Sequence, residues 1–356
     1  MPWKTRRTEP AEPPFPIKGK VGRIEDPPHP AFFRRYVEAN RPVILIGVLE
    51  PWPALGRWTP EYLAAVAGER RGEVIVSANG LYPDYLTQPS PMAKVEMPVS
   101  EFLRRAGGKA EAGEPLPPVL AAGETYYVYG KSYLLDAVPR LAQDLGTPAC
   151  LGNVPVSTRG VWISSPGCVT PLHYDLPNGL LCQVLGSKRV YLFDPAQHDR
   201  LYPRSPKFPG FDNFERQSQV DIHHPDLAAF PEFRRAEALE CVLRQGETLF
   251  IPSNWFHEVE TLELSISVTF GFAGGTSTSE LAALSEVFKK LSGDRQGTVS
   301  GMDLFRRAGD AAVPTLDLAA DPAALQEMMT SPAVQRLLQD PAMLDSLARL
   351  MAGRAG

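Results

Sequence analysis

The chain has 356 residues, of which 44% are hydrophobic, and a formal net charge of −5 at pH 7. This length and composition support one large domain, or a medium domain with an appendage, around a substantial core. The acidic balance argues against a nucleic-acid partner and against binding to an anionic membrane. No apolar run approaches membrane-spanning length, so we expect a globular protein without a membrane partner.

Residues 1–30 are predicted to form a flexible leader. The segment is basic and proline-rich and lacks the apolar centre of a signal peptide, so a cytoplasmic location is expected. The four cysteines are widely spaced and include no CxxC pair. This spacing predicts reduced, buried thiols and neither a zinc knuckle nor a disulfide framework.

The stretch from residue 31 to about 120 alternates helical and strand patterns. PAFFRRYVEAN (30–40) and TPEYLAAVAG (59–68) are typical of helices, the second with Thr59 as its N-cap. PVILIGVL (42–49) and EVIVSA (73–78) are typical of strands. We interpret this stretch as an α/β flank of the domain that follows, which gives a single domain over 31–276.

From residue 124 to about 272 the pattern turns strongly to β. Short runs rich in β-branched and aromatic residues are separated by Gly, Pro, Asn or Asp, as in TYYVYG, GVWISSPG and LSISVTFGF. Many short strands at regular spacing favour a double-sheet jelly roll of the cupin kind. The predicted fold is therefore mainly β with flanking helices, built on a double-stranded β-helix core.

Residues 277–356 are predicted to be helical. A capping box runs from Ser277 to Glu280, and three later segments each begin with Asp-Pro or Ser-Pro, as helices often do. The region forms either a small cap packed on the core or a methionine-rich surface for peptides.

One stretch, VTPLHYDLPNGLLCQVLGSKRVYLFDP, carries the most specific chemistry. On a strand His173 and Asp175 point to the same face, and His257 follows the apolar strand ETLFIP. Two histidines and one carboxylate form the facial triad of non-haem Fe(II) oxygenases. The alternative is a chance HxD with ordinary core histidines.

Lys188 heads the apolar strand RVYLF, fifteen positions after the first of these histidines. An ammonium group at the inner end of such a strand is costly to bury unless an anion meets it. The alternative is a lysine that only closes a hairpin turn.

Together the segments TPLHYD, GSKRVYLF, RQSQVDIHHPD and GETLFIPSNWFHEVE resemble the JmjC (cupin-like) family of Fe(II)- and 2-oxoglutarate-dependent oxygenases. The likeness covers roughly residues 31–272 and is strongest to the asparaginyl hydroxylases that act on hypoxia-inducible factor. It implies an enzyme that couples decarboxylation of 2-oxoglutarate by O2 to hydroxylation of a substrate C–H bond.

The resemblance also implies roles for individual residues. Iron would be held by His173, Asp175 and His257. The 2-oxoglutarate would be bound by Lys188, Thr170 and Tyr127, with two departures from the family pattern: Asn178 comes one residue early, and Thr269 replaces a second asparagine. Substrate contact falls on Arg216 and Gln217, against the alternative of ordinary loop polarity.

The substrate implied by the resemblance is a protein or peptide side chain, with tRNA or a small molecule as alternatives. A catalytically silent cupin that binds partners through its C-terminal helices stays open, as does a metal-dependent isomerase. The helix from Ser277 lies where small JmjC hydroxylases carry dimerising helices, which predicts a homodimer. The segments from Asp321, Ser331 and Asp340 resemble DP or STI1-type helical repeats.

Overall fold

The computed structural model describes residues 13–83, 86, 90–108, 125–131, 133–175, 177–204 and 216–272. Residues 1–12 of the predicted leader and the whole predicted helical region 277–356 lie outside the described residues, together with the homodimer and repeat predictions that rest on that region. The rest of the predicted leader is structured, because residues 17–20 and 23–25 form strands of the two sheets. Within the described part, no helix has the length and apolar character needed to cross a membrane.

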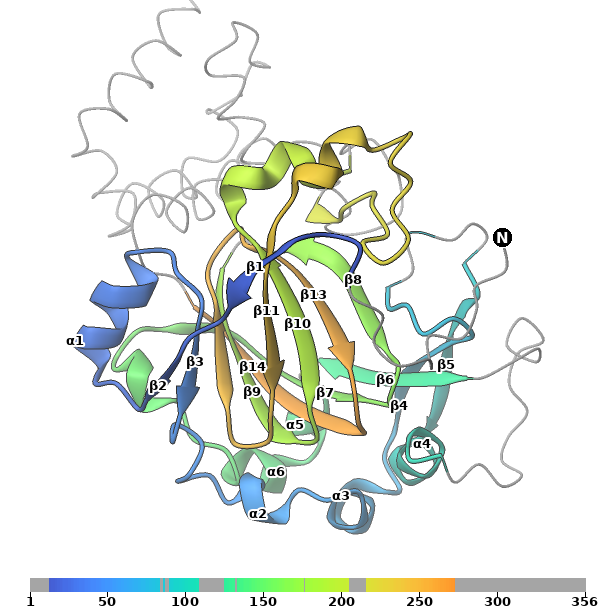
Figure 1. Ribbon diagram of the computed structural model, residues 1–356. Coiled ribbons are helices and arrows are strands. Elements are labelled where there is room, and N and C mark those ends of the chain that lie inside the picture. Colours follow the sequence, from blue (N-terminus) through green and yellow to red (C-terminus); the bar gives the residue numbers. More distant parts are fainter. Residues whose placement is uncertain are drawn as a thin grey trace, which may run out of the picture.

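Two β-sheets form the body of the protein (Figure 1). The five-stranded sheet has the order β1-β11-β10-β13-β8. Its strands are β1 (Ile17–Lys20), β8 (Val169–Tyr174), β10 (Lys188–Phe193), β11 (Ala238–Leu243) and β13 (Phe256–Thr261).

The nine-stranded sheet has the order β2-β3-β12-β9-β14-β7-β6-β4-β5. Its strands are β2 (Arg23–Glu25), β3 (Val43–Ile46), β4 (Arg71–Ser77), β5 (Met92–Pro98), β6 (Tyr126–Lys131), β7 (Val156–Ser164), β9 (Asn178–Leu185), β12 (Thr248–Ile251) and β14 (Ser265–Phe272). From β7 to β14 the chain alternates between the sheets at every step except β10 to β11, which confirms the predicted jelly roll.

The sheets pack face to face. Side chains from both meet in one buried apolar cluster, in which Leu181 and Leu249 of the larger sheet pack with Val190 and Leu192 of the smaller. Along each strand, side chains that point into this space between the sheets alternate with side chains on the outer face, which other elements must cover.

Short helices of the N-terminal flank, and others in 133–151 between β6 and β7 that the sequence did not predict, cover the outer face of the nine-stranded sheet. These are α1 (His29–Phe32), the π-helical turn η1 (Phe33–Val37), α2 (Ala54–Arg57), α3 (Pro60–Ala67), α4 (Val99–Ala106), α5 (Tyr133–Ala137), α6 (Pro139–Gln143) and the 3-10 turn η3 (Ala149–Leu151). The α/β flank is confirmed, including the cap, since the Thr59 hydroxyl accepts a hydrogen bond from the Tyr62 amide at 3.2 Å. Asp144 ties the flank together by accepting bonds from Arg57, Trp58 and Tyr62.

Two described stretches of the connection between β10 and β11, residues 194–204 and 216–237, cover part of the outer face of the five-stranded sheet. We call these two stretches the β10–β11 insertion. It contains the 3-10 turns η4 (Pro195–Leu201) and η6 (Pro231–Arg235), and lies at the end of the sheets opposite α2 and α3 (Figure 1). Its buried residues Val220, Ile222 and Phe233 pack in one cluster with Tyr191 and Phe256 of the sheet.

The four cysteines are free and buried, as predicted.

Candidate metal centre

Two neighbouring strands of the five-stranded sheet bring the predicted triad together. His173 on β8 lies directly opposite His257 on β13, and Asp175 follows one residue after β8 ends. One ligand atom from each of the three residues lies within 4.8 Å of the others. The Nε2 atom of His257 is 3.9 Å from Oδ2 of Asp175, so the three groups point to one place.

Both imidazoles are held in the same way. Nδ1 of His173 lies 2.8 Å from the Pro171 carbonyl oxygen, and Nδ1 of His257 lies 3.0 Å from that of Trp255. A carbonyl oxygen only accepts, so Nδ1 is the donor in each ring and Nε2 is the nitrogen left for coordination. Both Nε2 atoms are thus presented for coordination, the arrangement that metal-binding histidines require.

A register shift in the pairing of β8 with β13 supports this orientation. His257 pairs with His173, but Val259 pairs with Thr170, so β8 has one extra residue between the two pairs. Pro171 lies in this bulge, where its missing N–H costs no ladder hydrogen bond. The bulge leaves the Pro171 carbonyl free to accept from His173.

The electrostatics of the triad suit a divalent cation. Burial, with the charge of His257 as a further cause, lowers the pKa of His173 to about 4. Burial would raise the pKa of Asp175, but the positive charges of His173, His257 and Arg216 outweigh it and the pKa is lowered. At neutral pH the site therefore offers a neutral imidazole and a carboxylate, the forms that bind metal.

The two predicted substrate residues lie beside the triad. The Nη1 atom of Arg216 is 3.6 Å from Oδ1 of Asp175, and Gln217 forms an isolated antiparallel bridge with His173. The Gln217 side chain is buried, and its Oε1 atom has no hydrogen-bond partner among the described residues. An amide oxygen in this state is ready to accept a bond from a ligand.

Lys188 lies on the same inner face, at the other end of the sheet. It is 6% exposed, and it stands opposite Thr261, four residues along β13 from His257. Burial lowers the pKa of its ammonium group to about 8. Within the part of the chain that the structure describes, no carboxylate forms an ion pair with it. A buried cation in this state points to an anionic ligand.

Thr170 lies between the triad and Lys188. It is half-buried on β8 and pairs with Val259, which lies midway between His257 and Thr261 on β13. Its hydroxyl therefore lines the path between the metal position and the lysine.

Tyr127 is not brought to this path, contrary to the prediction. Its side chain lies in the cluster under the flank helices, and its hydroxyl is 3.5 Å from Nη1 of Arg105. Successive side chains of a strand point to opposite faces, so Tyr126 is the inward-facing tyrosine of β6. It packs with Cys168, whose thiol is close enough to affect the pKa of Lys188.

Asn178 is likewise placed away from this path. Its side-chain oxygen accepts a bond from the Ser253 amide at 3.0 Å, in the turn that leads to His257. Gly179 takes the inward position, where an added Cβ would have only the Ile251 carbonyl oxygen nearby, at 3.8 Å. The expected cosubstrate role of Asn178 is therefore replaced by support of a turn.

Thr269 does face inward, where its hydroxyl accepts a bond from the Trp162 indole at 3.3 Å. Sequence reasoning also missed two hydroxyl groups near Lys188, those of Ser164 and Thr261, which lie 2.9 Å apart. Their strands were visible in the sequence, but the packing of β7 of the larger sheet against the end of β13 of the smaller sheet was not.

Comparison with known proteins gives a family match over most of the chain. Residues 29–274 match the model described as "Cupin-like domain". The chain is 33% identical over 258 residues to Lysine-specific demethylase 8 of Danio rerio, covering 70% of this chain and 58% of that protein. It is 30% identical over 276 residues to human Bifunctional peptidase and (3S)-lysyl hydroxylase JMJD7, covering 71% and 84%.

A third relative is tRNA wybutosine-synthesizing protein 5 of Danio rerio, 32% identical over 245 residues, which cover 67% of this chain and 70% of that protein. The chain spans little more than half the length of several relatives, such as the demethylases. The names of these relatives range over lysine and tRNA chemistry. They support the wider family and not specifically the asparaginyl hydroxylases.

Proposed function

This chain belongs to the cupin-like, or JmjC, domain family, and from that membership and its site we propose that it is an Fe(II)- and 2-oxoglutarate-dependent oxygenase. The observation that carries the proposal is a pair of features on one inner face: the triad of His173, Asp175 and His257, and the buried Lys188. Two imidazoles and one carboxylate suit Fe(II) and leave half of its coordination sphere open.

When bound, iron and 2-oxoglutarate supply the oxidising chemistry that inserts one oxygen atom of O2 into a C–H bond. The chain's own residues hold and orient these groups. Lys188 lies four residues along β10 from the partner of His257, about 13 Å at strand spacing. A lysine side chain and a short dicarboxylate would together fill that span, and Lys188 would hold the distal carboxylate.

Two hydroxyl groups are proposed to assist Lys188. Thr170 lies along the path, and Tyr126 replaces Tyr127 in the role of inward-facing phenol. Hydrogen bonds from hydroxyl and ammonium donors to one carboxylate strengthen each other's effect in a site shielded from water.

The test is succinate formation from 2-oxoglutarate in the presence of Fe(II), O2 and ascorbate. We expect His173→Ala and Lys188→Ala to abolish succinate formation that the wild-type chain supports. A chain that binds no iron and forms no succinate in any variant would instead be a catalytically silent cupin that acts by binding partners.

We further propose a protein or peptide side chain as the substrate. Relatives named for lysine demethylation and lysyl hydroxylation support it, and Arg216 and Gln217 offer a cation and an amide beside the metal position. The relative named for tRNA wybutosine synthesis keeps tRNA as the second candidate.

To decide between them, wild-type and His173→Ala chains would each be incubated with a lysate and with bulk tRNA. Mass spectrometry would then seek a gain of one oxygen atom that depends on His173. A gain on nucleosides alone would replace the protein proposal. The homodimer stays a prediction, which light scattering of the full chain would test. The C-terminal repeats stay a prediction as well.

A further inference from the structure

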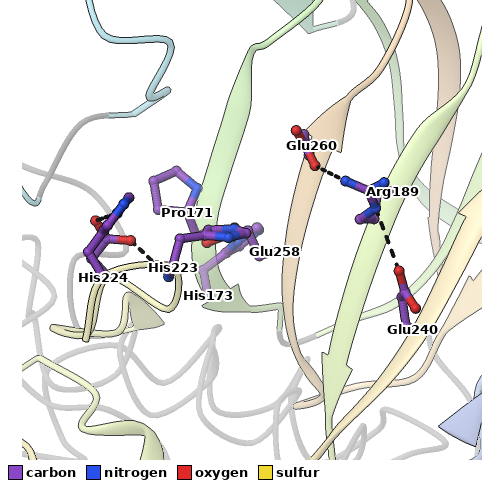
Figure 2. A network of polar contacts seen from close by, with 9 residues as sticks. Pro171, His173, Arg189, His223, His224, Glu240, Glu258 and Glu260 are labelled. Atoms are coloured by element: carbon purple, nitrogen blue, oxygen red, sulfur yellow. Dashed lines mark hydrogen bonds and ion pairs between the residues drawn. The ribbon is translucent and has the colours of Figure 1, made fainter. Parts of the chain in front are cut away.

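Glu258 is a buried carboxylate that the site described above does not use. It follows His257 on β13, so its side chain points to the outer face of the sheet, and it is only 3% exposed. Its Oε1 atom lies 2.5 Å from Nε2 of His223, in the β10–β11 insertion (Figure 2). A buried carboxylate is costly unless it is paired, so this contact is a strong constraint on the insertion.

The turn that carries His223 is built to present it. The Asp221 side chain accepts a hydrogen bond from the His223 amide at 3.0 Å, and Ile222 between them is fully buried. The His223 ring also packs edge to face on Tyr191 of β10, with 5.9 Å between ring centroids. These contacts fix the imidazole before it meets the carboxylate, so little entropy is lost in forming the pair.

The same insertion touches the other metal-bearing strand a few residues earlier. The Ser218 amide donates to the Leu172 carbonyl at 2.8 Å, next to the bridge between Gln217 and His173. Arg216 then extends to within 3.6 Å of Asp175. The insertion is thus attached to β13 through His223 and to β8 through Ser218, and Arg216 lies just beyond the second attachment.

We propose that His223 and Glu258 form a latch that holds the β10–β11 insertion on the two metal-bearing strands and so positions Arg216 beside Asp175. Both are positioning residues, since they act through Arg216 and neither touches the metal position. The inference rests on the proposed function in one respect, that Asp175 is a metal ligand.

His223→Leu breaks the latch and leaves Glu258 buried without its partner. The chain offers a matched control in the next residue: His224 is 67% exposed and forms its ion pair with the other oxygen of Asp221, at 3.4 Å. His224→Leu therefore makes the same chemical change in the same turn and leaves both His223 and Glu258 in place.

The first readout is amide hydrogen exchange of the metal-free protein. In His223→Leu we expect exchange in 216–224 to be faster by about tenfold or more, because this segment opens locally, with β9, β12 and β14 unchanged. His224→Leu should exchange like the wild type. Equal protection of 216–224 in His223→Leu and wild type, or equal opening in the control, would overturn the latch.

The second readout is the Kd for Mn(II), a redox-inert stand-in for Fe(II). We expect His223→Leu to weaken Mn(II) binding by about tenfold, as for other groups that support metal ligands from outside, and His223→Gln to recover part of the loss. An unchanged Kd in His223→Leu would overturn the positioning role.

Should His223→Leu not fold, Glu258→Gln keeps the shape and removes the charge, and faster exchange in 216–224 is again expected. An unchanged rate in that variant would overturn the latch. Amide hydrogen exchange is measured without iron or 2-oxoglutarate, so the two proposals can fail separately. The latch proposal can be wrong in a protein that forms succinate, and it can be right in a protein that forms none.

Discussion

The two sheets carry different kinds of side chain. The five-stranded sheet carries the two candidate histidine ligands, Lys188, Thr170 and, on its outer face, the buried Glu258. The nine-stranded sheet carries most of the large apolar side chains that pack under the flank helices, among them Phe250, Phe270 and Phe272.

The two sheets also differ in the partners of their buried charged side chains. On the outer face of the smaller sheet Arg189 lies between Glu240 and Glu260, and Glu258 meets His223 (Figure 2). In the flank of the larger sheet Asp144 accepts three hydrogen bonds. Lys188, on the inner face, has no such partner among the described residues. The buried charges on the outer faces are thus paired within the protein, whereas the charge of Lys188 has no such partner and marks the path of a ligand.

The largest expected effect concerns the packing of the nine-stranded sheet. Phe270 is 1% exposed and packs against Trp52, with 5.8 Å between ring centroids. Phe270→Ala should lower the free energy of unfolding by about 3–5 kcal/mol, measured by urea denaturation. Below the unfolding transition its Kd for Mn(II) should stay within about twofold of the wild-type value. A large loss of metal affinity would show that the two sheets are not separable in this way.

The second prediction concerns Lys188 and pH. Burial lowers its pKa from 10.5 to about 8 in the folded protein, so between these values the unfolded state binds more protons. The stability of the ligand-free protein should therefore rise as pH increases from about 8 to 10.5, by about 3 kcal/mol.

Lys188→Met should lose this rise, and the comparison of the two urea curves across pH removes the contribution of other groups. Bound 2-oxoglutarate should reduce the rise in the wild type, because the carboxylate stabilises the charged ammonium group. Parallel curves for the two proteins would contradict the assignment of an unpaired cation.

The smallest expected effect separates two adjacent tyrosines. Tyr126→Phe removes the hydroxyl group on the inner face and should raise the KM for 2-oxoglutarate by about tenfold, the cost of one hydrogen bond to a charged group. Tyr127→Phe removes a hydroxyl group near Arg105 under the flank helices and should leave that KM unchanged. Succinate formation measures both, and the reverse result would restore Tyr127 to the site.

Much of the fold and the site could be predicted from the sequence because the signals are local. Runs of β-branched residues between turn residues identify strands whatever their neighbours are. The spacing of His173 and Asp175 places both on one side of a strand, and the aromatic run around His257 identified the third ligand.

The local sequence pattern shows that side chains alternate between the two faces of a strand. It does not show which of the two sets points inward. Tyr126 and Tyr127 are equivalent by that pattern, and the packing of the flank helices decided that Tyr127 faces outward. For the same reason Gly179, and not Asn178, took the inward position.

The sequence by itself determined the double-sheet fold, the three candidate ligands and the lysine, since each depends on residue types and short spacings. The tertiary structure alone decided which hydroxyl groups face Lys188 and that His223 pairs with Glu258, 35 residues away along the chain. Contacts of that kind depend on strand register and on how a long insertion folds back. These are set by packing over the whole domain and leave no pattern in neighbouring residues.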